Sequence, residues 1–416
     1  MSLAGSLRGV VTCVAAGLLS PVAWAAPGEH LVAGDVVVAP RIGLGFEYTS
    51  NATRVEEVTA SDGATNLRIA PGLDLWVNRP DLAASLKGTY ELRKHFVASQ
   101  VGLDRYDDFT LVGDIDALKE SMLGFRIGEA VGLQNFPVDA ESLDHPYTKQ
   151  FRNQTSAAVA FRPRSAIEIA AGGSYSLDDY STASSGSDQR HYNTRHTYGP
   201  VANAAWHVLP RTAVVIDFSY SHAFYTDPVV EQEASEDVVL PDHNMLRIAG
   251  GLRGRIIDRL VVGLTAGYGS AAYIEESVPG TDPAAAIDLQ GIDRLLLNIN
   301  ARYEISSDDG ISASLQKDYR DSFFTNYVSY LKGQVGVDAR FTPRIGFIGE
   351  FSVADENFRG METRNDLVLG AKLDLSYYIR EWASVSAGGS WQERASDDIS
   401  IQYDQFSARL LANIQY

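Results

Sequence analysis

The sequence is almost free of cysteine, because Cys13 is the only one among 416 residues. It lies in an N-terminal stretch typical of a secretory signal, with a basic residue at Arg8, an apolar run from Gly9 to Leu19, and Ala23-Trp24-Ala25 as an A-x-A cleavage site. We expect cleavage after Ala25, so that residues 1–25 are the signal peptide. The mature chain then has no thiol, which excludes disulfides, cysteine nucleophiles and cysteine metal sites.

The rest of the chain lacks both long apolar runs and an excess of basic residues. No segment approaches the roughly 20 apolar residues that a membrane helix needs. The net charge of −18 predicts that the protein does not bind nucleic acid through counterion release. Proline (15) and methionine (4) are few beside glycine (36) and tyrosine (20), which favours a large β protein rich in aromatic residues. No linker or low-complexity tract divides the chain, so we expect a single domain at 38–416 after a short periplasmic segment at 26–37.

The clearest pattern is an alternation with a period of two between Tyr327 and Ala354. Apolar or small residues, among them Tyr327, Leu331 and Phe341, alternate with polar ones such as Lys332 and Arg340. The motif Thr342-Pro343-Arg344 interrupts the pattern, which resumes at once from Ile345 to Val353. This predicts a long hairpin on a very short turn, with one apolar and one polar face. After Ala354 the sequence becomes polar and irregular, and we expect the second strand to end there.

Similar short turns recur along the chain, roughly 35 to 50 residues apart, a spacing that fits two strands and one longer loop. The eight predicted turns are Asn78–Asp81, Leu118–Glu120, Arg162–Arg164, Leu209–Arg211, Ile257–Arg259, Ser307–Gly310, Thr342–Arg344 and Ile379–Glu381. Counting strands on either side gives about eighteen, from Val38–Asn51 to Ile401–Tyr416. The fold class is therefore predicted as all-β, a transmembrane antiparallel barrel with short periplasmic turns, longer extracellular loops and both termini on the periplasmic side. The alternative is a soluble β-sandwich, which would need shorter strands and polar outer faces.

Both ends of the predicted barrel resemble known outer-membrane proteins. In the final strand, apolar residues lie at alternate positions, and the chain ends on an aromatic residue: Phe406, Ala408, Leu410, Ala412, Ile414 and Tyr416. This resembles the C-terminal signal that the barrel assembly machinery recognises, although Phe is the usual last residue. Near the start, the motif from Pro40 to Tyr48, followed by Asn51, resembles the opening strand of a β-barrel porin family that accompanies bacterial exopolysaccharide-export genes.

The family resemblance implies an integral outer-membrane pore that secretes a polysaccharide. It also implies contact with outer-membrane lipid and lipopolysaccharide, and with a separate periplasmic polysaccharide-export protein. From the residues alone we derive only a pore with a polar lumen. A diffusion porin for small solutes is therefore the first alternative, and a surface receptor or adhesin is the second.

Placing the apolar face of each strand against lipid puts the polar face in the lumen, because Arg or Lys at mid-membrane depth on the lipid face costs about 2 to 4 kcal/mol. The basic residues with the closest spacing in this predicted lumen are candidates to bind an acidic polymer, since the guanidinium fork binds planar anions at two points. They are Arg247, Arg253, Arg255, Arg294, Arg302, Lys332 and Arg340. The alternative is that these side chains pair with lumen carboxylates and brace the wall. An inward Trp76 could stack on a sugar ring.

The negative charge of the chain is concentrated in predicted loops. Asp227, Glu231, Glu233, Glu236, Asp237 and Asp242 fall in one loop that has no basic residue. Such a loop could form an acidic vestibule if it folds inward. As a solvated outer face it could bind divalent cations alongside lipopolysaccharide.

We found no pattern that indicates an enzyme, a metal site or a cofactor. Ser221 and His222 are adjacent on one predicted strand, so their side chains point to opposite sides. The eight histidines lack metal-ligand spacing. Glycines such as Gly43 and Gly250 fall within strands rather than in phosphate-binding loops.

Overall fold

The computed structural model describes residues 30–50, 63–96, 105–135, 148–182, 191–226, 242–274, 291–322, 327–359 and 363–415. These residues form strands β1 (Leu31–Ala33), β2 (Val36–Thr49), β3 (Ala64–Asn78), β4 (Leu82–His95), β5 (Arg105–Ala117), β6 (Leu123–Asn135), β7 (Thr148–Arg164), β8 (Ile167–Thr182), β9 (His191–Leu209) and β10 (Thr212–Tyr225). They continue with β11 (His243–Ile257), β12 (Leu260–Tyr273), β13 (Ile292–Glu304), β14 (Gly310–Asp321), β15 (Tyr327–Thr342), β16 (Ile345–Arg359), β17 (Arg364–Arg380), β18 (Ala383–Ser396), the 3-10 turn η2 (Ile399–Ile401) and β19 (Tyr403–Gln415).

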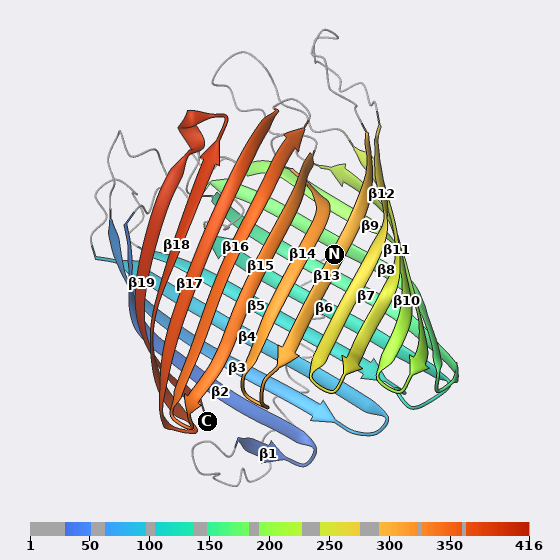
Figure 1. Ribbon diagram of the computed structural model, residues 1–416, viewed down its shortest axis with the longest axis horizontal. Helices are drawn as coiled ribbons and strands as arrows, with labels where there is room; N and C mark the ends of the chain where they lie inside the picture. The colour runs from blue at the N-terminus through green and yellow to red at the C-terminus, as the bar shows by residue number, and fades with distance from the viewer. Residues whose placement is uncertain are drawn as a thin grey trace, which may run out of the picture.

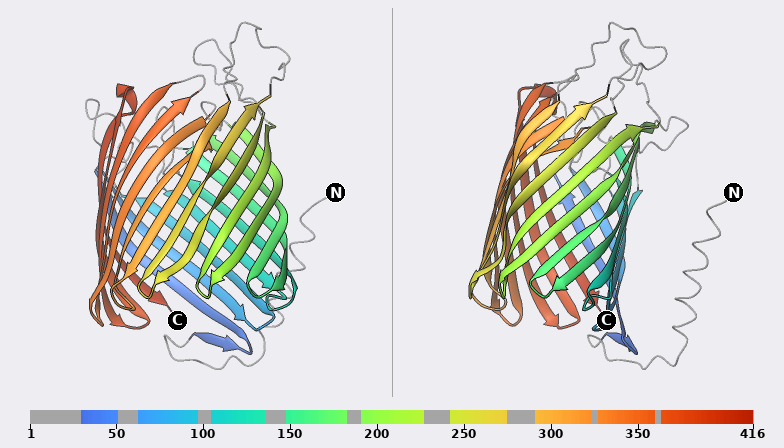
Figure 2. Two further views of the ribbon diagram at one scale, coloured as in Figure 1. Left: turned by 45° about the vertical axis from the view of Figure 1, so that its right-hand side comes forward. Right: turned by 90° about the vertical axis from the view of Figure 1, so that its right-hand side faces the viewer.

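Strands β2 to β19 form a closed antiparallel barrel of eighteen strands (Figures 1 and 2). Each strand pairs with the next along the chain, and β19 pairs with β2, from Ser407↔Thr49 to Gln415↔Arg41. Strand β1 is an addition that pairs with the first residues of β2. The predicted fold class and strand number are therefore confirmed.

The predicted short turns all lie at one end of the barrel, at the bottom of Figure 1. Strand β9, for example, ends at Leu209 and β10 begins at Thr212. Strand β2 starts and β19 ends at this same end, as predicted. The expectation that a strand ends near Ala354 is wrong, because β16 continues to Arg359 while pairing with β15 and β17. Near its end Glu356 is 7% exposed and lies within ion-pair distance of Arg320 and Arg394.

The outer face of the barrel is apolar. On β17, Leu373 and Leu375 are 58% and 51% exposed, and the register places them on the face away from Asp374. A soluble protein rarely exposes so much contiguous apolar surface. Exposed aromatic residues lie at two levels of this face: Trp206 is close to a short turn, and Tyr198 lies eight residues from it along β9. This apolar belt between aromatic residues is the outer surface of a membrane-spanning barrel, and the protein is an integral outer-membrane protein.

The described residues contain no helix that is both long and apolar enough to span a membrane.

Candidate functional site: the barrel lumen

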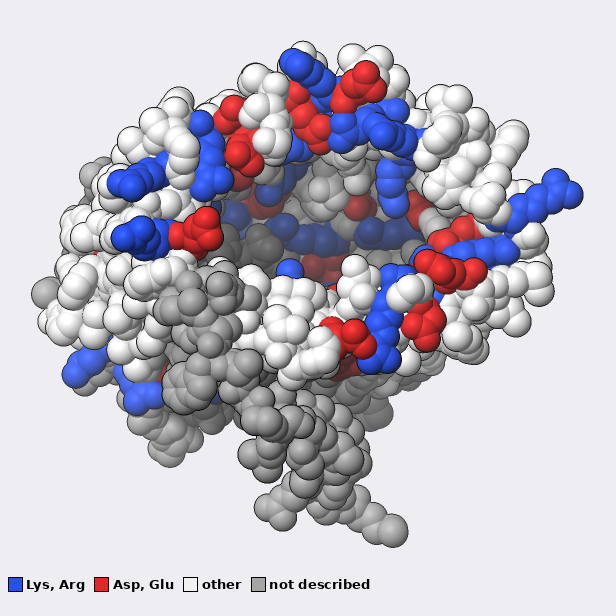
Figure 3. All heavy atoms as spheres, turned by 90° about the horizontal axis from the view of Figure 1, so that it is seen from below, with Lys and Arg blue, Asp and Glu red and all other residues white. Residues whose placement is uncertain are grey.

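Charged side chains line the inner face of the barrel, which is hollow when viewed from the short-turn end (Figure 3). The strand registers place every basic candidate of the sequence analysis on this inner face. Arg302, for example, lies on the face opposite to the outward Tyr303. Trp76 also points inward, near the short-turn end of β3, and its ring meets His30 edge-on at 5.4 Å.

Most lumen arginines reach across one intervening strand to a carboxylate. Arg255 of β11 pairs with Glu304 of β13 at 2.8 Å, and Arg302 of β13 pairs with Asp338 of β15 at 2.6 Å. Arg126 of β6 and Arg409 of β19 make equivalent pairs, with Glu168 of β8 at 2.8 Å and with Asp374 of β17 at 2.7 Å. Each pair ties together strands that share no backbone hydrogen bonds, so it braces the wall.

These ion pairs need a small residue on the strand between their partners. A Cβ built on Gly310 of β14 would lie 2.8 Å from Nη2 of Arg302, and one built on Gly388 of β18 would lie 2.0 Å from Oδ1 of Asp374. Glycine at these positions therefore leaves the space that the bridging side chains occupy.

The seven basic candidates divide into two groups. Arg247 pairs with Asp318 at 3.2 Å, Arg340 lies 3.8 Å from Asp308, and Arg255 and Arg302 make the pairs given above. Arg253, Arg294 and Lys332 have no ion pair or hydrogen bond with any described side chain. We call these three the unpaired cations. The bracing role thus applies to four candidates, whereas ligand binding stays a prediction for all seven.

The unpaired cations lie on one part of the wall, on β13, β15 and β11. Arg294 is near the loop end of its strand, and Arg253 is near the short-turn end of its own. Arg253 and Lys332 are exposed, and Arg294 is half-buried. Carboxylates without a described partner, Glu47 and Asp114, lie on β2 and β5. The lumen therefore offers free charges of both signs, on different parts of its wall.

One hairpin end bends into the lumen, and we call its described residues, 318–322 and 327–330, the β14–β15 tip. The pairing between β13 and β14 stops at Leu297↔Lys317, whereas β14 continues to pair with β15 up to Asp321↔Tyr327. Beyond this point Tyr319 packs on the inner surfaces of β12 and β13, where it is 1% exposed. The cluster around it consists of Ala271, Ile292, Leu296 and Tyr327, with Met245 and Tyr273 beside it.

The inward position of this segment corrects one expectation from the sequence. Tyr327 belongs to the alternating apolar pattern and was expected on the lipid face, yet it is 4% exposed within this inner cluster. The cause is the separation of β14 from β13, which lets the end of the hairpin bend into the barrel. Alternation within one strand contains no signal for such a separation.

A buried polar network joins the β14–β15 tip to strands β8, β9 and β11. Asp321 accepts hydrogen bonds from Arg195 Nη1 of β9 at 2.9 Å and from His243 Nε2 of β11 at 3.0 Å. Arg195 also donates from Nη2 to Asp178 of β8 at 2.9 Å. His243 and Asp178 are 1% and 2% exposed. Since a buried charge is tolerated only when it is paired, the network holds the tip in one position.

The tip is tied on its other side as well. Arg320 lies 3.4 Å from Glu356 of β16. Arg394 of β18 lies 3.5 Å from the same carboxylate and 2.6 Å from Asp366 of β17. The sequence does not single out these residues, nor Asp178, Arg195 and Asp321. They are far apart in the chain and come together only when the barrel closes.

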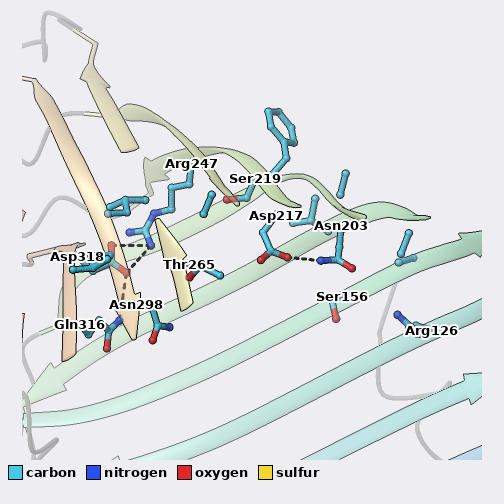
Figure 4. A pocket seen from close by; sticks show the side chains of 18 of the residues that line it. Arg126, Ser156, Asn203, Asp217, Ser219, Arg247, Thr265, Asn298, Gln316 and Asp318 are labelled. Atoms are coloured by element: carbon cyan, nitrogen blue, oxygen red, sulfur yellow. Dashed lines mark hydrogen bonds and ion pairs between the residues drawn. The ribbon is translucent and has the colours of Figure 1, made fainter. Parts of the chain in front are cut away.

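A cavity of about 500 Å³ lies beside the tip, along the inner surfaces of β6 to β14 (Figure 4). Its polar lining consists of paired charges, amides and hydroxyls, among apolar side chains such as Ala249 and Leu296. Asp217 accepts a hydrogen bond from the Asn203 side chain, and Asp318 contacts both Arg247 and Gln316. Ser156, Ser219, Thr265 and Asn298 complete its polar lining. Such a wall can hydrate and hydrogen-bond small polar solutes.

The predicted acidic loop lies almost entirely outside the described residues. Asp227, Glu231, Glu233, Glu236 and Asp237 belong to the part that is not described. Asp242 is described, and its side chain accepts a hydrogen bond from the backbone N–H of Tyr225 at 3.2 Å. Both the vestibule and the cation-binding hypothesis stay predictions. No group of three His, Cys, Asp or Glu residues within the described ranges could hold a metal ion.

No family model and no curated protein matches the chain. Among solved structures, the FrpB iron transporter from Neisseria meningitidis is similar at 10% identity and a TM-score of 0.49, covering 86% of this chain and 62% of that one. This chain therefore spans less than two thirds of the FrpB length. A BenF-like porin from Pseudomonas fluorescens Pf-5 has 10% identity and a TM-score of 0.49, with 92% and 99% covered. OpdK from Pseudomonas aeruginosa has 13% identity and a TM-score of 0.45, with 92% and 98% covered.

At such low identity the function of this chain has to be inferred from its own residues. They form a membrane-spanning barrel with a charged, hollow lumen, which is the architecture of a pore.

Proposed function

We propose that the protein is an outer-membrane diffusion pore for small polar solutes. The observation that carries this proposal is the β14–β15 tip, which packs on the inner face of the barrel and is held there by a buried ion pair on one side and a half-buried one on the other. A fixed narrowing passes small molecules and slows large ones. The polar lining next to it supplies hydrogen bonds that replace part of the water around a solute.

Secretion of a polysaccharide is the second candidate, and the family resemblance of the first strand suggested it. The unpaired cations favour it, because Arg253, Arg294 and Lys332 lie on the same part of the wall at different distances from the short turns. Cations in such a row could contact successive carboxylates or sulfates of an acidic polymer. The fixed tip favours small solutes instead, since a chain molecule would have to pass it along its whole length.

Swelling of liposomes that contain the purified protein separates the two candidates. We expect rapid swelling in a monosaccharide, with a rate that falls steeply from disaccharide to trisaccharide. Vesicles loaded with an acidic polysaccharide should retain it. Release of the polymer together with no size dependence among the small sugars would contradict the diffusion pore and support secretion.

A further inference from the structure

Among the described residues, the outer face of the barrel carries a carboxylate at the middle of the membrane belt. Glu129 lies on β6, on the same face as Phe125 and Ile127, which are 48% and 49% exposed. The register confirms the direction, because Ile127 pairs with the outward Ile115, and the inward Arg126 contacts Asp116 and Glu168. Glu129 is the fourth of the seven outward positions of its strand. Its carboxylate therefore lies where hydrocarbon would surround it.

Two side chains of β7 accompany this carboxylate. Asn153 Nδ2 donates a hydrogen bond to Oε1 of Glu129 at 2.7 Å, and Thr155 Oγ1 donates one to Oε2 at 2.5 Å. Each carboxylate oxygen can accept a further bond, and the Asn153 amide has a second N–H. Lipid chains supply no partner for these groups. An ionisable residue at this depth is expensive unless protein covers it.

The other outward positions at this depth are different. Midway along the described strands they are apolar or small, as in Leu44, Leu373 and Leu410. Lys317 of β14 is an exception, but its long side chain can carry the charge towards the membrane surface. Glu129 has no such freedom, because Asn153 and Thr155 hold its carboxylate against the strand.

The residues around the carboxylate are unusually small. Gly113 of β5 pairs directly with Glu129, and Thr155 pairs with it on the other side. Ala157 of β7 follows on the same face and pairs with Gly173 of β8. Gly113, Ala157 and Gly173 therefore leave room for another backbone to approach, beside the larger Tyr175 of β8, which pairs with Thr155 and is 39% exposed. Small residues with hydrogen-bonding side chains among them are typical of contacts between proteins within membranes.

We propose that this surface, made of Gly113, Glu129, Asn153, Thr155, Ala157 and Gly173 and here called the β5–β8 patch, binds a second copy of the chain about a two-fold axis. The patch contains an acceptor, Glu129, and a donor in the second N–H of Asn153, so it is complementary to itself. In a two-fold contact each carboxylate can accept a hydrogen bond from the partner's Asn153 amide, and the same surface supplies both copies. The proposal does not depend on which solute the lumen passes.

A single cysteine tests the geometry, because the mature chain is predicted to contain none. Ala157→Cys places a thiol in the patch, and Leu373→Cys places one on the outer face of β17 as a matched control. With a short thiol-to-thiol cross-linker in native membranes, we expect a covalent dimer from Ala157→Cys and none from Leu373→Cys. No dimer from Ala157→Cys, although a small maleimide labels its thiol, would overturn the proposal.

A second measurement tests the role of the carboxylate. Native mass spectrometry in mild detergent should find two copies of the unmodified protein and one copy of Glu129→Leu. Glu350→Gln, which removes an inward carboxylate on β16, should stay dimeric. A monomer from the unmodified protein, or a trimer from it, would refute the two-fold contact.

Discussion

At the residue scale, the ion pairs of the lumen depend on glycine residues that leave room for the charged side chains of the neighbouring strands. Arg409 reaches Asp374 only because Gly388 on the intervening strand has no side chain. The pattern repeats with Gly310 below Arg302. An inward glycine is thus needed for an ion pair between side chains of the two strands beside it. This explains why alternation alone predicts which residues face the lumen but not which of them pair.

We predict that Gly388→Ala weakens the barrel, because the new Cβ would lie 2.0 Å from Oδ1 of Asp374 and displace its carboxylate from Arg409. Loss of a partly buried charged hydrogen bond costs about 1.5 to 3 kcal/mol. Urea unfolding in lipid vesicles should show a lower midpoint. The neighbouring outward Gly389→Ala is the control, since its Cβ would be 3.4 Å from the nearest atom. Equal midpoints for both variants would argue against the steric account.

A second prediction concerns the unpaired cations. Replacing Arg253, Arg294 and Lys332 together by Gln removes three positive charges without freeing any described carboxylate. The reversal potential across a salt gradient should then shift towards cation selectivity. Removing both members of a pair, in Arg302→Gln with Asp338→Asn, should leave it nearly unchanged. If the double variant shifts the potential as much as the triple one, pairing has no influence on selectivity.

At the scale of elements, the β14–β15 tip is the feature that turns a wide barrel into a narrowed pore. Its apolar contacts around Tyr319 and its buried contacts at Asp321 hold it on one side, and the ion pair of Arg320 with Glu356 holds it on the other. Breaking a buried ion pair by removing one charge costs about 3 to 5 kcal/mol. The tip should therefore come loose when one of these contacts is lost, while the barrel stays closed.

We predict that Asp321→Asn gives channels with a larger mean conductance and frequent transitions between levels. Asn keeps the shape of the side chain but removes the negative charge that Arg195 and His243 contact at position 321. Of its ion pairs, Arg195 then keeps only the one with Asp178. The control is Asp308→Asn, whose carboxylate is exposed and 3.8 Å from Arg340. Single-channel traces of Asp321→Asn that match those of the control would show that the network does not hold the tip.

One short turn should respond to acid. The Asp309 carboxylate accepts hydrogen bonds from the backbone N–H of Arg340 at 2.5 Å and from Ser306 Oγ at 2.7 Å. These two bonds lower the pKa of Asp309 below its ordinary value of 3.8. A lowered pKa stabilises the folded state above the ordinary value, and this stabilisation is lost as the pH falls through the lowered pKa. Asp309→Asn should therefore lower the thermal midpoint at neutral pH but not in strong acid, and an equal difference at both pH values would contradict this.

The sequence predicts the strands and short turns well, because a lipid-facing surface imposes a period of two on every strand. All eight predicted turns are present, and the basic candidates lie on the inner face. The tip could not be predicted, since Tyr319 and Tyr327 follow the outward pattern of their strands and yet lie inside. Its anchors, Asp178, Arg195 and Asp321, belong to strands distant in the sequence. Glu129 could not be recognised for a different reason. It is a single polar residue in an outward apolar pattern, and its contacts with Asn153 and Thr155 form only in the folded barrel.

At the scale of the whole molecule, residues that alternate along each strand lie on two different surfaces of the barrel, one outside and one inside. Within the described residues the outer one is apolar at mid-membrane depth except at Lys317 and the β5–β8 patch, and the inner one is charged, largely paired and narrowed by the β14–β15 tip. A wide barrel alone would give a large opening. The fixed tip inside it is what limits the size of the solutes that we expect to pass.

Single-channel recording of the refolded protein in a planar bilayer tests this account most directly, with polyethylene glycols of increasing size added on both sides. We predict a steady conductance that small polymers reduce and large ones leave unchanged, with the size limit moving upwards in Asp321→Asn. A protein that inserts but conducts no ions, or a size limit that is the same in both proteins, would contradict the claim that the lumen is an open pore narrowed by the β14–β15 tip.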